Sequence, residues 1–323
     1  MKSILIMVCS SLLMTALAQA MVNRDFNKLD SISQPAEVEA LVASLDKRFA
    51  KFRVNTALTF EDDYCLKLPK AASAIVKTDL DNNGSTDMLV FGMLERKPVI
   101  IAIIDAGNNT HALKNITRSF SRRCSTAEVI REDQKTLVEY FYFKQPVWTY
   151  DSAHAVGATR LIHKIESSKL IYKFDDFVEY NKSPQNHQIE KIKYKQGGFS
   201  IEIFSNETAR YKTTGYDPLR GRGMFNAWFN STLKESEWSE LTGLLNYLDF
   251  TNLADKYYIS GSHYATGILE IIYDDGKVKT INDDGLMGTF GLNRVYQMMN
   301  ALKNNQAWNL EPTKALVPLP RTR

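Results

Sequence analysis

The residues best suited to chemistry lie in one acidic loop, residues 79–87, whose sequence has the form D-x-D-x-N-G-x-x-D. Calcium takes six to eight oxygen ligands, and a short loop with carboxylates and amides at alternate positions can supply them. The candidate metal ligands are Asp79, Asp81, Asn83, Ser85 (through its backbone carbonyl) and Asp87. The loop predicts a structural calcium ion, because a coordination sphere filled by protein leaves little room for substrate.

The context of this loop differs from that of an EF-hand. An EF-hand needs a bidentate Glu at position 12, where this chain has Val90, and residues 75–78 and 88–91 are typical of strands. The loop resembles instead the calcium loops of FG-GAP and integrin-type propeller repeats, which lie between strands. It occurs once, so it does not predict a propeller, which needs several similar blades. The alternative is a metal-free turn, because Asp and Asn favour turns by themselves.

Hydrolysis by dispersed residues is a second possible chemistry. Asp175 and Asp176 could act as a carboxylate pair, and His163 and His263 could take part in acid–base steps. A solvated turn is the simpler interpretation of the two aspartates, because separation in space decides such cases. The chain lacks the H-E-x-x-H, G-x-S-x-G, P-loop and G-x-G-x-x-G patterns. The sequence therefore favours a protein without catalytic residues.

An aromatic loop around Gly261 is a candidate for ligand binding. The rings that surround this glycine are those of Tyr257, Tyr258, His263 and Tyr264. An exposed loop of this composition could bind a saccharide or a protein segment. The same rings could instead cap the hydrophobic core, and the sequence leaves both interpretations open.

The basic residues do not indicate a nucleic-acid partner. The 40 Lys and Arg residues nearly balance the 37 Asp and Glu residues, and the net charge is +3. A nucleic-acid-binding protein needs a strong, clustered excess of positive charge, and Arg118, Arg122 and Arg123 form only a small group. Alternate lysines in residues 191–195 predict a solvated edge strand that is protected from aggregation.

The first 20 residues have the pattern of a secretion signal. Lys2 supplies the positive end, an apolar run follows, and Ala18-Gln19-Ala20 forms a cleavage site that would leave Met21 first. Lipidation of Cys9 is the less favoured alternative, because Val8 before it is not small. No other segment is apolar enough to predict a transmembrane helix. We therefore expect a periplasmic or secreted protein.

Two cysteines, Cys65 and Cys124, remain after removal of the signal. In an exported chain, two cysteines predict one disulfide, which would close a loop of about 60 residues. In the chain-entropy account such a loop contributes about 4 kcal/mol to stability. The alternative is a pair of buried, reduced thiols.

Hydrophobic periodicity predicts a first domain over residues 35–180, after a polar segment at 21–34. A helix is predicted to begin at Pro35, because apolar residues recur at helical spacing from there to Phe52. Runs rich in strand-forming residues follow at 75–78, 88–94, 99–104, 137–143 and 170–174. We expect a mostly antiparallel β domain with a leading helix.

A polar, proline-containing linker at residues 181–186 predicts a second domain over residues 187–310. Its predicted element order is β-β-β-β-α-β-β-α, with a capping box at residues 232–235 before the first helix and a last helix over 291–304. This order fits a smaller antiparallel sheet with two helices on one face, so the fold class is α+β. Residues 311–323 contain three prolines and are predicted to be a tail.

The second domain resembles a family of unknown function found in exported Bacteroidota proteins, over about residues 187–309. The segments that carry the likeness are residues 241–250, 269–277 and above all 284–296, DGLMGTFGLNRVY. Residues 65–180 are similar to the calcium-loop segment that often precedes this module. The resemblance implies export and a small α+β module, and it implies no activity. Family members often carry two cysteines around a Gly-Pro turn, where this chain has Gln196-Gly197-Gly198-Phe199-Ser200.

Two functions are compatible with these features. The first is an exported, non-enzymatic binding or structural protein whose first domain is stabilised by calcium and whose partner is a protein or a saccharide. The second is a periplasmic or secreted hydrolase whose site is assembled from dispersed residues, since catalytic triads are defined by geometry and not by order.

Overall fold

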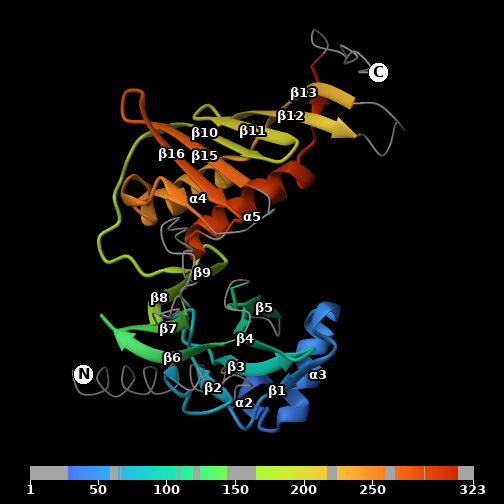
Figure 1. Ribbon diagram of the computed structural model, residues 1–323, viewed down its shortest axis with the longest axis vertical. Coiled ribbons are helices and arrows are strands. Elements are labelled where there is room, and N and C mark those ends of the chain that lie inside the picture. Colours follow the sequence, from blue (N-terminus) through green and yellow to red (C-terminus); the bar gives the residue numbers. More distant parts are fainter. Residues whose placement is uncertain are drawn as a thin grey trace, which may run out of the picture. The chain divides into compact units, whose positions relative to one another are not determined.

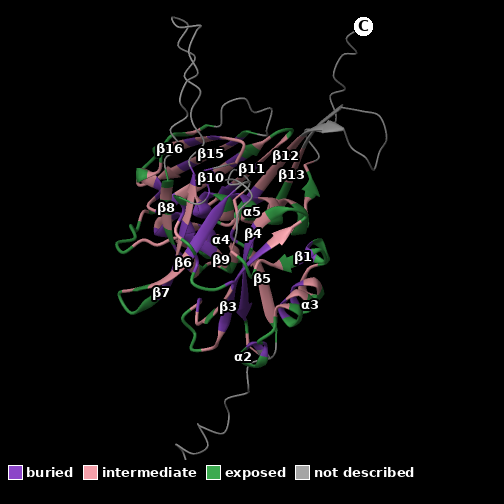
Figure 2. Cartoon of the chain, turned by 60° about the horizontal axis from the view of Figure 1, so that its bottom comes forward, coloured by how far each residue is buried: buried purple, intermediate pink, exposed green. Residues whose placement is uncertain are grey.

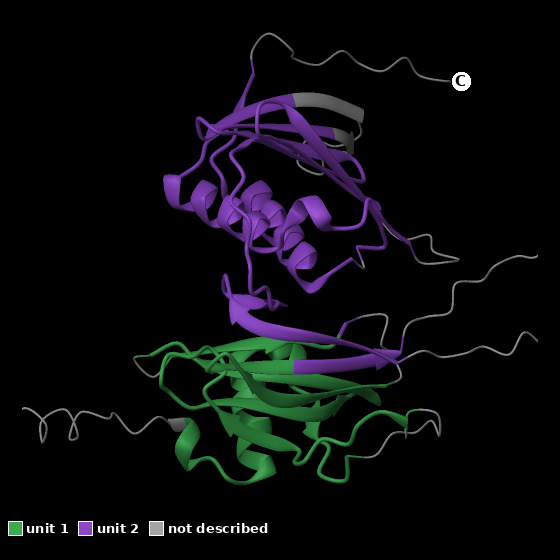
Figure 3. Ribbon diagram, turned by 90° about the vertical axis from the view of Figure 1, so that its left-hand side faces the viewer, with its two compact units in different colours: residues 1–117, 122–138 green, residues 118–121, 139–323 purple. Residues whose placement is uncertain are grey.

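The computed structural model describes residues 28–58, 65, 67–107, 110–118, 124–143, 165–216, 224–258, 266–286 and 288–311 (Figure 1). The predicted secretion signal, residues 21–27 of the polar segment and residues 312–323 of the tail lie outside these ranges. The chain divides into two compact units (Figure 3). Unit 1 comprises Met1–Thr117 and Arg122–Val138, and unit 2 comprises Arg118–Ser121 and Glu139–Arg323. The division therefore lies well before the predicted linker at 181–186.

Unit 1 begins with helices α2 (Lys28–Ser31) and α3 (Pro35–Leu45). The carboxylate of Glu37 accepts the backbone N–H of Gln34 at 2.9 Å, which completes the first turn of α3. The helix is shorter than the apolar spacing predicted, because Asp46 is extended and its side chain caps the short 3₁₀ helix η1 (Lys47–Phe49). Phe52 consequently belongs to strand β1, not to the helix.

A five-stranded antiparallel sheet forms the centre of unit 1, with the order β1-β3-β4-β5 and with β2 paired to β3. The strands are β1 (Phe52–Val54), β2 (Ile75–Thr78), β3 (Asp87–Leu94), β4 (Lys97–Asp105) and β5 (His111–Asn115). Most of β3 and β4 is buried (Figure 2). Alternate residues of these strands, such as Val90 and Ile101, pack against Val38 and Val42 of α3. The predicted leading helix therefore covers one face of the predicted sheet.

A four-stranded sheet has the order β6-β7-β8-β9. Its strands are β6 (Ser125–Glu132), β7 (Lys135–Phe143), β8 (Ile165–Lys173) and β9 (Asp176–Glu179). The sequence predicted β7 and β8 but missed β5 and β6, which lack a continuous apolar run. These two strands owe their conformation to pairing with β4 and β7, which local sequence does not encode.

Unit 2 contains an eight-stranded sheet with the order β14-β16-β15-β10-β11-β12-β13-β17. Its strands are β10 (Ile189–Gln196), β11 (Phe199–Phe204), β12 (Thr208–Tyr216), β13 (Met224–Thr232), β14 (Lys256–Tyr257), β15 (Thr266–Tyr273), β16 (Lys277–Asp284) and β17 (Asn309–Leu310). Helices α4 (Glu235–Tyr247) and α5 (Phe290–Asn305) lie on one face (Figures 1 and 3). Only the short β14–β16 pair is parallel. The predicted α+β class is thus confirmed.

Two local predictions in unit 2 were wrong. Helix α4 begins at Glu235, and its N-cap is Lys234, whose backbone N–H donates to Glu237 at 2.9 Å; the predicted box at residues 232–235 lies too early. Strand β10 is central in the sheet and pairs with β11 and β15, so it is not an edge strand. Lys191 and Lys193 are tolerated there because Glu202 on β11 lies 3.1 and 3.8 Å from them and Glu270 on β15 lies 4.0 Å from Lys193.

Candidate metal centre

The acidic loop joins strands β2 and β3, as the sequence predicted. Thr78 and Asp87 are register partners at the base of the hairpin, so the loop leaves and re-enters the sheet at one point. Gly84 at the bend has φ of +92°, a conformation that strains any residue with a Cβ atom. Asn82 also has a positive φ, of 62°, which asparagine tolerates better than most residues. The sequence of the loop thus suits a compact turn.

Three carboxylates of the loop converge. One oxygen from each of Asp79, Asp81 and Asp87 lies within 4.8 Å of the others. This spacing is compatible with three ligands on one calcium ion, because Ca²⁺–O distances are 2.3–2.6 Å and two ligands on opposite sides are about 5 Å apart. The structure therefore brings together the three acidic residues that the sequence nominated.

Hydrogen bonds within the loop hold the candidate ligands in place. The carboxylate of Asp79 accepts the backbone N–H groups of Asn83 and Gly84, at 3.0 and 2.9 Å. The Asn83 side chain donates to Asp81 at 2.8 Å, and its carbonyl oxygen accepts the N–H of Ser85 at 2.6 Å. These bonds hold the candidate ligands in a preformed arrangement and leave each carboxylate further lone pairs for a cation.

Asp87 is the most unusual member of the group, because it is fully buried. Its two oxygens accept backbone N–H groups from Leu80 and Asp105, each at 2.7 Å, and from Asp81 at 3.2 Å. Burial, followed by the nearby charge of Asp81, raises the pKa of Asp87 to about 6. Its three N–H donors oppose that rise without cancelling it.

The site gathers negative charge in one small loop. The pKa of Asp81 is also raised, mainly by burial and then by the charges of Asp79 and Asp105. Burial is the main cause of both rises, and repulsion between the neighbouring carboxylates adds to it. A bound divalent cation would offset that repulsion, because it is the largest local charge in any site that it occupies.

Sequence reasoning missed two residues that anchor the loop. Asp105, at the end of β4, is only 7% exposed, and its carbonyl accepts the side-chain N–H of Asn83 at 3.2 Å. Asn82 accepts the N–H of Thr136 at 2.7 Å and so attaches the loop to the start of β7. The sequence offered one signal for Asp105, which is an aspartate at the end of the apolar run of β4. The contact between Asn82 and Thr136 joins residues 54 positions apart, and local sequence does not indicate it.

The dispersed hydrolase candidates do not form a site among the described residues. His163 and His263 lie outside the described ranges. Asp175 is exposed in the turn between β8 and β9, where it accepts the hydroxyl of Tyr172 at 2.8 Å. Asp176 accepts the N–H of its neighbour Phe177 at 2.8 Å. These contacts fit the solvated turn that was the simpler interpretation.

The aromatic loop is described only at its start. Tyr258 is 64% exposed, and the hydroxyl of Tyr257 accepts the N–H of Ala254 at 3.3 Å. The rest of that loop, including Gly261 and Tyr264, lies outside the described ranges, as do Arg122 and Arg123. The structure therefore describes only part of either predicted cluster.

The two cysteines are joined, which confirms the predicted disulfide. Cys65 and Cys124 form a bond with their Cα atoms 5.6 Å apart, and both are buried. The bond connects the segment before β2 to the segment before β6. It therefore closes a loop that contains the whole acidic turn and strands β2 to β5.

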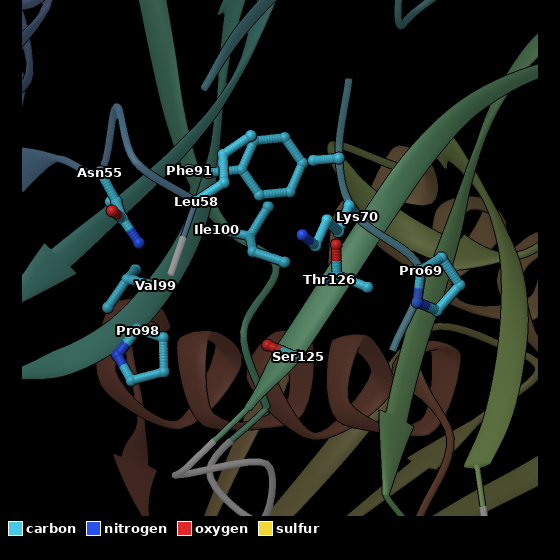
Figure 4. Close-up of a pocket in the computed structure, with 12 residues that line it drawn as sticks. Asn55, Leu58, Pro69, Lys70, Phe91, Pro98, Val99, Ile100, Ser125 and Thr126 are labelled. Carbon is cyan, nitrogen blue, oxygen red and sulfur yellow. The ribbon is translucent and has the colours of Figure 1, made fainter. Parts of the chain in front are cut away.

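A small hollow lies near this disulfide (Figure 4). It is lined by side chains from β3, β4 and β6, among them Phe91, Ile100 and Ser125. Its space of about 20 Å³ is enough for one water molecule and too small for a substrate. We therefore assign this hollow no ligand.

Comparison with known proteins gives one match. The family described as Domain of unknown function (DUF6438) matches residues 198–303, which lie within unit 2. The match supports the likeness of the C-terminal module to a family of unknown function and carries no activity. No curated protein and no solved structure matches this chain. Within the described ranges, every helix is too short or too polar to span a bilayer.

Proposed function

We propose that this chain is an exported, non-enzymatic binding or structural protein whose first unit is stabilised by a calcium ion at residues 79–87. The observation that carries the proposal is the convergence of three carboxylates on one point of a strand-flanked turn. The proposed ligands are Asp79, Asp81, Asn83, Ser85 and Asp87. The ion would neutralise carboxylates that lie close together and are partly or fully buried.

Two features support export. Residues 1–20 have the pattern of a secretion signal. The Cys65–Cys124 disulfide suits an oxidising compartment such as the periplasm or the extracellular space. The likeness to exported Bacteroidota proteins points in the same direction.

The binding interpretation is favoured over the hydrolase alternative. Two of the four suspected catalytic residues, Asp175 and Asp176, have local contacts typical of a turn. The third carboxylate of that region, Glu179, accepts the backbone N–H groups of Phe290 and Gly291 at 2.5 and 2.8 Å. A carboxylate used in this way stabilises the start of α5 and is not free to act as an acid or a base.

A thermal melt of the chain from Met21 tests the calcium proposal. Calcium at a hundredfold excess over its dissociation constant should stabilise the folded state by about 2.7 kcal/mol relative to a chelator. Asp81→Asn should abolish that shift, because it removes one ligand charge and keeps the size of the side chain. Asp275→Asn is the matched control, since Asp275 lies in the unrelated turn between β15 and β16. Equal melts with millimolar calcium and with chelator would make residues 79–87 an ordinary turn.

A further inference from the structure

The eight-stranded sheet has one face that no described helix covers (Figure 1). Alternation along the strands directs Ile192, Tyr194 and Ile201 toward α4 and α5, where they are fully buried. The intervening positions, such as Lys193, Glu202 and Arg210, lie on the opposite face, which we call the outer face. Cross-strand register places Glu202 beside Arg210, and Arg210 beside Asn230. The outer face therefore carries a row of polar side chains across β11, β12 and β13, beside apolar ones such as Phe204 and Ile272.

An open hollow of about 500 Å³ lies at the β12–β13–β17 end of this sheet. Its lining residues are Thr208, Ala209, Arg210, Asn230, Ser231, Thr232, Asn309 and Glu311. Seven of these eight side chains carry a hydroxyl, an amide or a charge. Sites for drug-like molecules are lined mainly by apolar groups, so this hollow suits a ligand that carries many hydrogen-bonding groups of its own.

Charge pairing indicates that such a ligand is neutral. Nη2 of Arg210 lies 3.2 and 3.3 Å from the two carboxylate oxygens of Glu311, so the one cation and the one anion of the hollow balance each other. Both bonds use Nη2, which leaves Nη1 and Nε as donors, while the carboxylate keeps lone pairs as acceptors. Adjacent donors and acceptors of this kind match the neighbouring hydroxyl groups of a sugar ring.

An aromatic ring adjoins the hollow. Trp228 on β13 lies beneath the guanidinium of Arg210, 4.8 Å from ring centroid to Cζ, and its backbone carbonyl accepts the N–H of Glu311 at 2.9 Å. Trp228 is partly exposed. Nζ of Lys212 lies 5.1 Å from the same ring centroid, so the indole contacts two cations and supports the guanidinium of Arg210 beside Glu311.

We propose that this hollow, with Trp228 at its border, binds a neutral oligosaccharide. The proposal deepens the binding function proposed above and rests on it, but the site is independent of the calcium loop. Arg210 and Glu311 bind neighbouring hydroxyls, Asn230 adds an amide, and Trp228 holds the guanidinium of Arg210 in position. No aromatic loop around residue 261 is required for this site.

The test uses the intact chain from Met21 and a panel of immobilised oligosaccharides. The neutral probes are oligomers of glucose, xylose, mannose and N-acetylglucosamine, and the acidic probe is polygalacturonate. We expect a neutral probe to bind with a dissociation constant below about 1 mM. Trp228→Ala should weaken that binding at least about tenfold, and Asn230→Ala, at an exposed position, should weaken it with the fold intact. Lys193→Ala, on the same face outside the hollow, is the matched control.

Each outcome decides the matter. Neutral-probe binding that is lost in the two hollow variants and kept in Lys193→Ala supports the site. Binding that both hollow variants retain overturns the location, and preference for polygalacturonate overturns the neutral ligand class. If no probe binds while the calcium-dependent melt is present, the saccharide proposal fails and the calcium proposal stands. The calcium proposal and the saccharide proposal can therefore be refuted independently of each other.

Discussion

At the residue scale, Asp87 connects the acidic loop to the hydrophobic core. It is the only carboxylate of the loop that is fully buried, and it accepts backbone N–H groups from both the loop and the end of β4. The same side chain would therefore both stabilise the fold and bind the proposed ion. The raised pKa follows from that position, since burial disfavours the charged form.

The raised pKa of Asp87 predicts a specific dependence of stability on pH. Its folded-state pKa of about 6 lies above the ordinary value of 3.8, so the folded state binds the proton more tightly. In chelator, the contribution of Asp87 to the free energy of unfolding should be full below about pH 4 and should be lost as the pH rises through about 6. The loss should be on the order of 1–3 kcal/mol.

The measurement is urea unfolding from pH 4 to pH 7.5 with the wild-type chain and Asp87→Asn. Other groups also titrate in this range. The contribution of Asp87 is therefore the difference between the two proteins in how steeply the free energy of unfolding changes with pH. We expect the wild-type chain to lose more stability than the variant as the pH rises, and calcium to reduce that loss. Parallel pH profiles in chelator would contradict the assignment.

At the element scale, the start of α5 explains the segment 284–296 that carries the family likeness. The backbone N–H of Gly288 donates to the buried Asp283 at 2.8 Å, and the hydroxyl of Thr289 accepts the N–H of Leu292 at 3.1 Å. Glu179 from β9 accepts the N–H groups of Phe290 and Gly291. The first three backbone donors of α5 are therefore satisfied by the side chains of Glu179 and Thr289, and Asp283 holds the residue before the N-cap.

Removal of the Glu179 carboxylate should loosen the first turn of α5. Glu179→Ala should lower the free energy of unfolding by about 1–2 kcal/mol, because two N–H groups lose their acceptor and the helix dipole loses its anion. Glu179→Gln should cost less, since the amide keeps one acceptor oxygen. Amide hydrogen exchange at Phe290 and Gly291 is the direct readout. Unchanged exchange at both amides in Glu179→Ala would show that Glu179 does not stabilise the turn.

Two helical glycines offer a matched pair for testing helix packing. A Cβ atom on Gly291 of α5 would lie 2.1 Å from the Leu248 side chain, whereas one on Gly243 of α4 would lie 3.7 Å from Phe174. Gly291→Ala should destabilise the fold by about 1–3 kcal/mol through overpacking. Gly243→Ala should stabilise it by about 0.5–1 kcal/mol, because alanine favours the helix. Urea unfolding of both variants checks the sign of each change.

The elements that the sequence predicted well are those whose signal is local. Strand β2 coincides with the predicted residues 75–78, and α5 begins one residue before the predicted 291, because apolar periodicity and turn residues mark both. The central position of β10 could not be predicted from its alternating lysines. These lysines pair with Glu202 on a neighbouring strand, and that contact exists only in the folded sheet. The three acidic residues of the candidate site were predictable from spacing, whereas the anchoring contact between Asn82 and Thr136 depends on tertiary structure.

At the scale of the whole molecule, the disulfide and the acidic loop act on the same unit. Cys65 and Cys124 are 59 positions apart, and both belong to unit 1 together with residues 79–87. A covalent loop limits the unfolded chain, and a bound ion favours the folded one, so the two effects stabilise this unit by different routes. Each should be measurable without the other.

Loss of the disulfide should therefore destabilise unit 1 and leave the carboxylate cluster able to bind calcium. The double variant Cys65→Ala, Cys124→Ala should lower the free energy of unfolding by about 4 kcal/mol in the chain-entropy account, because a loop of this length is released in the unfolded state. Hydrogen exchange followed by mass spectrometry should locate the faster exchange in peptides from β2, β3 and β4. A calcium-dependent rise in melting temperature should persist in the double variant, because all the proposed ligands lie within residues 79–87 and neither cysteine is among them. Loss of the calcium effect together with the disulfide would instead mean that the bond preorganises the loop, and the two sources of stability would then be coupled.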